Sequence, residues 1–172
     1  MHALVVYESM YGNTRRIAEA IAQGLAGRMR AEVAEVSSAP SHIGEDVALL
    51  VVGGPTHAFA MSRAGTRRSA AEDAPEGLVS TDAGIREWLS GLRTGSARLA
   101  AAAFDTRVAK PRLPGSAARG AAKRLRRLGV RLAAPAESFY VTGGHGPLVE
   151  GEVERARAWG EHLAASFPVP AS

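Results

Sequence analysis

Short apolar runs alternate with helix-patterned segments along most of the chain. Continuous apolar or β-branched runs predict strands at 3–7, 47–52, 99–104 and 138–142. The first three have the composition of strands buried on both faces, as in a parallel sheet. A fifth strand is predicted at 31–36, where two glutamates interrupt the apolar positions and indicate more exposure.

Helical spacing of apolar residues separates these strands. It predicts helices from Thr14 to about Gly27, from Asp82 to Leu92, from Ser116 to Gly129 and from 150 to 167, with Asp82 and Ser116 as N-caps. Strands alternating with helices predict a single doubly wound α/β domain over 1–167, built on a parallel sheet with right-handed crossovers.

Two segments lack either pattern. Residues 60–81 are long, polar and weakly periodic, which predicts a functional or mobile loop. Residues 168–172 are expected to form a flexible tail. A turn of helix before the strand at 47–52 is also compatible with the pattern.

The composition excludes several kinds of chemistry. The 172 residues include no cysteine, so disulfides, thiol catalysis, iron–sulfur ligation and the usual zinc sites are excluded, and no metal site is expected. The chain opens directly on a strand, and no apolar stretch approaches the roughly 18 residues of a membrane span. The expectation is a cytoplasmic protein.

Charge is distributed unevenly along the sequence. Nine of the 21 basic residues lie between Arg107 and Arg131, a window without acids, although the net charge is only +4. In the helix from Ser116, Arg119, Lys123, Arg126 and Arg127 fall on one face. The opposite side, with Ala118, Ala121, Ala122, Leu125 and Leu128, is expected to be buried. An acidic protein, a phosphorylated nucleotide or an anionic membrane could use such a face. A solvated face is the simplest reading, and nucleic acid is not expected because stacking aromatics are missing.

The strongest candidate site follows the first strand. The turn Ser9-Met10-Tyr11-Gly12-Asn13-Thr14 leads from a buried strand into a helix, where free main-chain N–H groups and the helix dipole favour an anion. Hydroxyls, an amide and a glycine suit a phosphate. The turn has no lysine, so it is no Walker loop, and no GxGxxG follows the strand. The alternative is a tight polar turn without a ligand.

This segment resembles the phosphate loop of flavodoxins. YESMYGNT matches their pattern at Ser9, Gly12, Asn13 and Thr14, with Tyr11 in place of a threonine, and is also similar to the Ser-Met-Tyr-Gly version of flavodoxin-like quinone reductases. The resemblance implies a five-stranded parallel sheet in the order 2-1-3-4-5 and non-covalently bound FMN. No side chain is implied as a catalytic acid or base, because the cofactor performs the chemistry.

Two further loops belong to the implied FMN site. Gly53-Gly54-Pro55-Thr56-His57-Ala58-Phe59 resembles the flavodoxin loop that covers one flavin face, with His57 where an aromatic residue often stands. By the same resemblance, Phe104-Asp105-Thr106-Arg107 would wrap the pyrimidine side of the flavin. No tyrosine is available there to stack, so one flavin face would be open or covered by 60–81.

Individual residues in these loops also have simpler readings. His57 can be a histidine at the edge of the core, Phe59 can be a core residue, and Arg107 can cover the following helix instead of the flavin. His145, in a glycine-rich turn after the last strand, lies near the same sheet edge and could touch substrate or flavin, or be incidental.

Three functions follow from these observations. The first is an electron-transfer protein that moves one or two electrons on FMN to a redox partner protein. The second is an FMN-dependent oxidoreductase that reduces a quinone with NAD(P)H or resembles flavodoxin-like protoporphyrinogen oxidases. The third is a flavodoxin-like binding module that has lost FMN.

Overall fold

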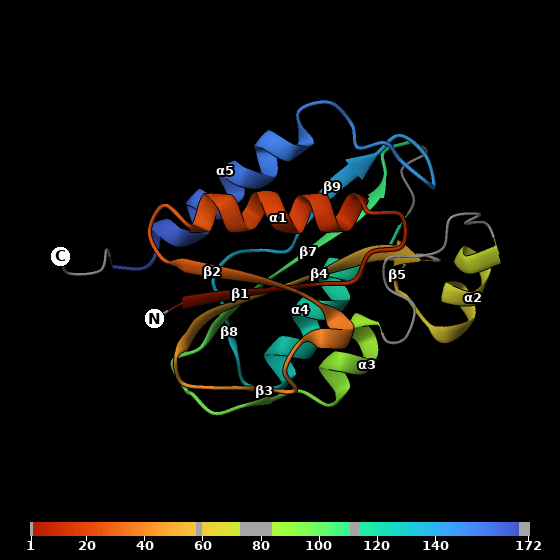
Figure 1. Ribbon diagram of the computed structural model, residues 1–172. Helices are drawn as coiled ribbons and strands as arrows, with labels where there is room; N and C mark the ends of the chain where they lie inside the picture. The colour runs from red at the N-terminus through yellow and green to blue at the C-terminus, as the bar shows by residue number, and fades with distance from the viewer. Residues whose placement is uncertain (1, 58–59, 73–83, 111–113, 169–172) are drawn as a thin grey trace.

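A parallel sheet forms the centre of the molecule, with helices on both faces (Figure 1). The structure, a computed structural model, describes residues 2–57, 60–72, 84–110 and 114–168. The predicted 168–172 tail and Asp82 as an N-cap therefore fall almost entirely outside the described residues.

The sheet has the strand order that the sequence predicts. Its main strands are β1 (His2–Tyr7), β2 (Arg30–Glu35), β4 (Val47–His57), β7 (Ala100–Val108) and β9 (Glu137–Val141). They pair in parallel in the order β2-β1-β4-β7-β9. The short β8 (Arg131–Leu132) pairs with the start of β7, so β8 and β9 together occupy the fifth position.

Four helices cover the two faces of the sheet. On one face lie α1 (Asn13–Leu25) and α5 (Glu152–Ala165), and on the other lie α3 (Ile85–Ser90) and α4 (Ala117–Arg127) (Figure 1). Successive residues of a strand point alternately into the two cores, one on each face of the sheet. In β4, Leu49 and Val51 face α1 and α5, whereas Leu50 and Val52 face α3 and α4.

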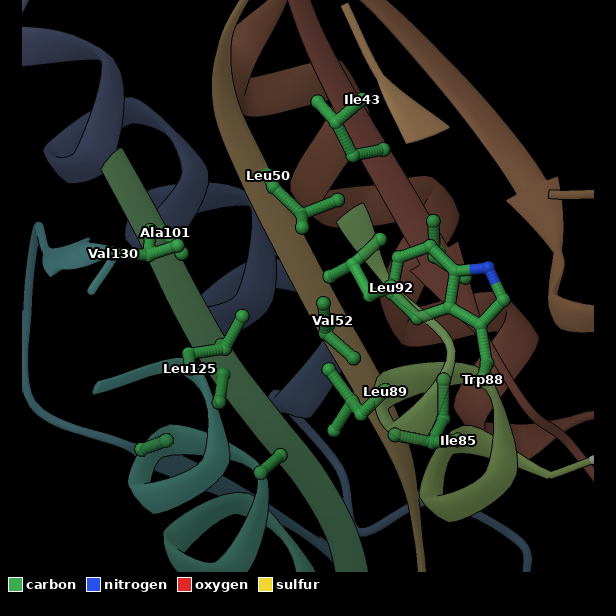
Figure 2. Packing of buried hydrophobic residues seen from close by; sticks show 14 of the residues in the cluster. Ile43, Leu50, Val52, Ile85, Trp88, Leu89, Leu92, Ala101, Leu125 and Val130 are labelled. Atoms are coloured by element: carbon green, nitrogen blue, oxygen red, sulfur yellow. The ribbon is translucent and has the colours of Figure 1, made fainter. Parts of the chain in front are cut away.

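Figure 2 shows the core under α3 and α4, where Leu50 and Val52 pack against Ile85, Leu89 and Leu125. Trp88 of α3 closes this core, and its indole N–H donates to the main-chain oxygen of Pro40 (3.2 Å). The opposite core is filled by Phe104, Phe139 and Trp159, which meet edge to face.

Small elements complete the fold. The 3-10 turn η1 (Val36–Ser38) is the turn of helix that the sequence allowed before the third main strand. β3 (His42–Ile43) pairs with β6 (Arg93–Thr94), and β5 (Ala60–Met61) returns antiparallel against the end of β4. α2 (Ala64–Glu72) follows at the carboxyl end of the sheet.

Several expectations about loops are wrong. The residues 53–57 and 104–107, expected as loops, are strand, because β4 and β7 pair with each other up to Pro55 and Thr106 and β9 then extends the pairing to Val108. The expected loop at 60–81 contains β5 and α2 in its described part. Leu128, expected to be buried, is 42% exposed because α4 ends at Arg127.

Candidate functional site

A cavity of about 340 Å³ opens where the main strands end, a volume within the range of small-molecule sites. It brings together the ends of β1, β4, β7 and β9 with α2. Its lining consists of Ser9, Met10, Tyr11, Asn13, Thr14, Pro55, Thr56, His57, Thr66, Ser69, Ala70, Thr106, Arg107, Val108, Val141 and Gly144. This set contains no carboxylate and one permanent cation, Arg107.

The loop 9–14 has a compact, internally bonded shape. Ser9 is fully buried, and its Oγ accepts from the Gly12 N–H (3.1 Å). Gly12 has φ 90°, a backbone conformation that favours glycine. Thr14, also buried, shares a hydrogen bond of 2.7 Å with the hydroxyl of Thr106 in β7. The end of the loop is therefore bonded to β7, which lies two strands away from β1 in the sheet.

His145 lies against this loop from the other side of the cavity rim. Asn13 Nδ2 donates to its main-chain oxygen (3.2 Å), and its ring lies 4.3 Å from that of Tyr11, centroid to centroid. The expectation that His145 lies near this sheet edge is confirmed. Together with Arg15 and Arg16, His145 lines a second, shallower hollow around the start of α1.

Helix N-termini at this edge differ in how their positive ends are compensated. Glu8 accepts from the Ile85 N–H at the start of α3 (2.8 Å), and Asp105 accepts from the Ala118 N–H in α4 (3.0 Å). α5 has Glu152 and Glu154 in its first turn. α1 has no acid in its first turn, and its N-cap, Gly12, makes no side-chain cap hydrogen bond. Among the residues that the structure describes, α1 is thus the one of these four helices with no carboxylate at its N-terminus.

The end of β4 contributes Pro55, Thr56 and His57 to the lining. Nδ1 of His57 lies 3.2 Å from the hydroxyl of Thr66 in α2. Burial, together with the nearby Arg67, lowers the pKa of His57, which favours the neutral ring. Ala58 and Phe59, the other two residues expected from this segment, lie outside the described residues.

The segment 104–107 divides between core and cavity. Phe104 is fully buried, with its ring packed directly under Gly53, and does not line the cavity. Asp105 is also fully buried and caps α4 through Ser116 and the Ala118 N–H. Thr106 and Arg107 line the cavity. Since successive strand residues face opposite sides, only part of the expected segment presents side chains there.

α2 forms a wall that the sequence pattern did not specify. Thr66, Ser69 and Ala70 line the cavity, and the hydroxyl of Tyr11 donates to the main-chain oxygen of Ala70 (3.4 Å). The only signal in the sequence was the length of the segment 60–81. Val141 at the end of β9 and Gly144 after it were also not expected.

A buried polar network attaches this wall to the sheet. Glu8, 1% exposed, accepts hydrogen bonds from the Ile85 N–H and from Ser62. Arg67 of α2 donates to Ser62 Oγ (2.8 Å) and pairs with Glu87 of α3. Burial raises the pKa of Glu8 even though these hydrogen bonds and Arg67 act in the opposite direction.

The flavodoxin family model matches residues 5–74 of the sequence, which include the loop 9–14 and the end of β4. Solved structures match nearly the whole chain. A flavodoxin from Bacillus cereus, crystallised oxidised, is 15% identical with a TM-score of 0.69, over 98% of this chain and 100% of that one. The chain has the flavodoxin fold. The resemblance inferred from the loop 9–14 and the predicted strand order are therefore confirmed.

Other flavodoxin structures extend this similarity. An archaeal flavodoxin is 18% identical with a TM-score of 0.63, over 96% of this chain and 98% of that one. A flavodoxin, WrbA-like protein from Agrobacterium tumefaciens is 20% identical with a TM-score of 0.58, over 96% of each chain. No curated protein matches the sequence. At identities this low, the solved structures show that this chain shares the flavodoxin fold.

Neither a membrane-spanning helix nor a cluster of metal-binding side chains occurs in the part of the chain that the structure describes. No described helix is long and apolar enough to cross a membrane. No group of three or more histidine, aspartate and glutamate side chains able to hold a metal ion occurs among the described residues.

Proposed function

We propose that this flavodoxin-like protein binds FMN in the cavity and carries one or two electrons on it. The observation that supports this most is the uncompensated N-terminus of α1. Carboxylates of the protein accept from N–H groups in the first turns of α3 and α4, and α5 has two glutamates within its first turn. A phosphate from outside the chain would complete the series at α1.

The residues at the cavity fit such a ligand. The main-chain N–H groups of the first turn of α1 and the hydroxyls of Ser9 and Thr14 would hold the phosphate, next to the Asn13 amide. The flavin ring would lie in the cavity beside Tyr11 and His57. The described residues of the lining include no carboxylate, which suits a ligand with an anionic phosphate and a ring that gains negative charge on reduction.

Bound FMN would supply the electron-transfer chemistry, and the chain would tune it. Arg107 is the permanent cation of the lining, so it would stabilise negative charge on the ring. We expect Arg107→Ala to lower the midpoint potential of bound FMN and Arg107→Lys to retain most of it. Spectroelectrochemical titration checks this, and unchanged potentials in Arg107→Ala would contradict the role.

FMN uptake itself is tested by titrating FMN and riboflavin into the protein and following flavin fluorescence. We expect FMN to bind more tightly than riboflavin. Asn13→Asp adds a carboxylate to the first turn of α1 and should weaken FMN binding at least about ten-fold, or ~1.4 kcal/mol, through repulsion of the phosphate. Riboflavin, without a phosphate, should be little affected.

Gln23→Glu is the matched control, because it adds the same charge near the other end of α1, at an exposed position. FMN affinity should not change in this variant. If Asn13→Asp binds FMN as well as the wild type does, the phosphate is not at α1. If the wild type takes up neither flavin, the third reading, a binding module without FMN, replaces this proposal.

A second candidate is an FMN-dependent oxidoreductase that reduces a quinone, or acts in the manner of a protoporphyrinogen oxidase. It is favoured by the small side chains of Ser69 and Ala70 in the α2 wall, where a flavin face would have room for a substrate. Steady-state consumption of NAD(P)H with a quinone, without an added reductase, would distinguish this enzyme from an electron carrier.

A further inference from the structure

The two helical layers of this fold differ sharply in charge. α1 and α5 together contain four basic and four acidic residues. α3 and α4 contain six basic residues and one acid, Glu87. The basic residues of α3 and α4, together with Arg63, form a surface that we call the basic face: Arg63, Arg86, Arg119, Lys123, Arg124, Arg126 and Arg127.

Neighbouring carboxylates do not neutralise this surface. Among the described residues, no basic side chain of α4 forms an ion pair within 4.0 Å, and Glu87 pairs with Arg67 of α2. Arg124 donates instead to the main-chain oxygen of Arg86 (3.2 Å) and to Ser90 (2.8 Å). The pKa of Arg86 is lowered by burial and by the nearby Arg63 and Arg124. The positive charges are therefore close together, and within α3 and α4 only Glu87, which also lies near Arg86, offsets them.

The positive charge of Arg119 is unfavourable in the first turn of α4, where the helix dipole is also positive. Ser116 caps α4 by accepting from the N–H of Arg119, three residues on. This third position of a capped helix favours Glu, which completes a capping box and suits the positive helix end. α5 has Glu154 at the equivalent position. A basic residue at 119 costs local stability, which is expected where the charge serves binding.

The basic face adjoins the candidate flavin cavity. Arg86 donates to the main-chain oxygens of Met61 (3.0 Å) and Ser62 (3.3 Å). The next residue, Arg63, donates its N–H to Thr66 (2.9 Å), and Thr66 lines the cavity. A protein docked on the basic face would therefore lie beside the cavity rim.

We propose that the basic face, formed by α3, α4 and Arg63, is a docking surface for an acidic protein. Charge complementarity between the surfaces would steer and orient the encounter. The docking itself does not need the cofactor. That the docked protein exchanges electrons with this one rests on the proposed function.

The same surface suits a protein better than a nucleic acid or a membrane. It offers no exposed aromatic side chain for base stacking, since Trp88 of α3 is buried. It also has no apolar stripe for insertion into lipid, because the buried side of α4 packs on the sheet. Leu128, 42% exposed beside Arg127, is an isolated apolar contact within a charged surround, as in protein interfaces.

The test uses the acidic haem protein cytochrome b5 as a probe, with binding to the full chain measured by calorimetry. We expect binding that weakens at least about ten-fold between ~20 and ~200 mM NaCl, as screening shortens the reach of the charges. The basic haem protein cytochrome c should not bind. Because FMN-free and FMN-loaded protein should behave alike, failure of flavin uptake would leave this result interpretable.

Two triple variants locate the surface. Lys123→Glu, Arg126→Glu and Arg127→Glu should together weaken binding at least about ten-fold. Arg28→Glu, Arg30→Glu and Arg157→Glu change three exposed bases elsewhere and alter the net charge equally, so they should change binding less than about three-fold. If the first triple variant fails to fold, the same three positions changed to Gln should show a smaller loss in the same direction.

Three results would overturn the proposal. The first is equal weakening by both triple variants, which would indicate a general charge effect. The second is no salt-dependent binding of cytochrome b5, which would leave a solvated face. The third is tighter binding of a single-stranded oligonucleotide or of phosphatidylserine vesicles than of cytochrome b5 at the same salt concentration.

Discussion

The two faces of the sheet are covered by helix pairs that meet their neighbours in different ways. α1 and α5 approach each other through Gly24 and Gly160, where a Cβ on Gly160 would overlap the main-chain oxygen of Ile21. Their charges are balanced. α3 and α4 also pack on the sheet through apolar side chains, but Glu8 and Asp105 are in addition bonded to their first turns. Their outer surface is strongly basic.

The two helical layers therefore differ in how their helix N-termini are stabilised and in which of them could receive a ligand. The α1 and α5 layer is held by close packing, so α1 needs no carboxylate at its N-terminus, which remains available to an anion. In the α3 and α4 layer, Glu8 and Asp105 stabilise the helix N-termini, and the excess positive charge lies on the outer surface. Substitutions in one layer at a time should change the free energy of unfolding by amounts that decrease from Gly160 to Glu8 to Arg119.

Gly160→Ala should have the largest effect on stability, because main-chain atoms block the new methyl group and the two helices must separate. We expect the free energy of unfolding to fall by about 2–3 kcal/mol, even though Ala favours helix. Urea denaturation measures this. Gly27→Ala, whose Cβ would meet only an ordinary contact at 3.8 Å, is the control and should stay within about 0.5 kcal/mol.

Glu8→Ala should be next, because it removes the acceptor of the Ile85 N–H and of Ser62 in a buried site. The expected loss is about 2 kcal/mol in the free energy of unfolding. Retention of wild-type stability would contradict the role of Glu8 as the link between α2, α3 and the sheet.

The contribution of Glu8 to the stability of the protein should fall as pH rises. Its pKa in the folded protein is raised above the ordinary 4.5, so its contribution to stability is complete below that value and is lost as pH rises through the folded pKa. Glu8→Gln cannot ionise. The stability of the wild type relative to Glu8→Gln should therefore fall as pH rises from about 4.5, which denaturation at several pH values measures.

The smallest effects come from exchanging the charges at the third position of α4 and α5. Arg119→Glu should raise the free energy of unfolding by about 0.5–1 kcal/mol, and Glu154→Arg should lower it by a similar amount. Both effects should shrink at high salt. If Arg119→Glu is destabilising, the positive charge at 119 is not a local cost, and that argument for the basic face is lost.

The sequence was sufficient for the main strands and for the loop 9–14. Short apolar runs such as 47–52, which is followed at once by Gly53-Gly54-Pro55, predict strands buried on both faces, and the phosphate-loop pattern is contiguous. Neither prediction needs distant information. Ser116 as a helix cap was predicted for the same reason, since capping is a local hydrogen bond.

Predictions that depended on where a strand stops were less successful. Phe104 and Asp105 were expected where the strand ends, but pairing with β9 continues β7 past them. The side chain of Phe104 enters the core and that of Asp105 caps α4, so neither lines the cavity. The α2 wall was unpredictable for a similar reason. Its position depends on Glu8, more than fifty residues earlier in the chain, through Ser62 and Arg67.

Sequence alone thus determined the alternation of strands and helices, the place of the loop 9–14 between β1 and α1, and the concentration of basic residues near α4. Only the tertiary structure decided which helix ends are already compensated, which charges are left exposed, and which side chains reach the cavity. The physical reason is that local patterns specify secondary structure and caps, whereas burial, compensation of helix dipoles and charge crowding depend on partners that are distant in sequence.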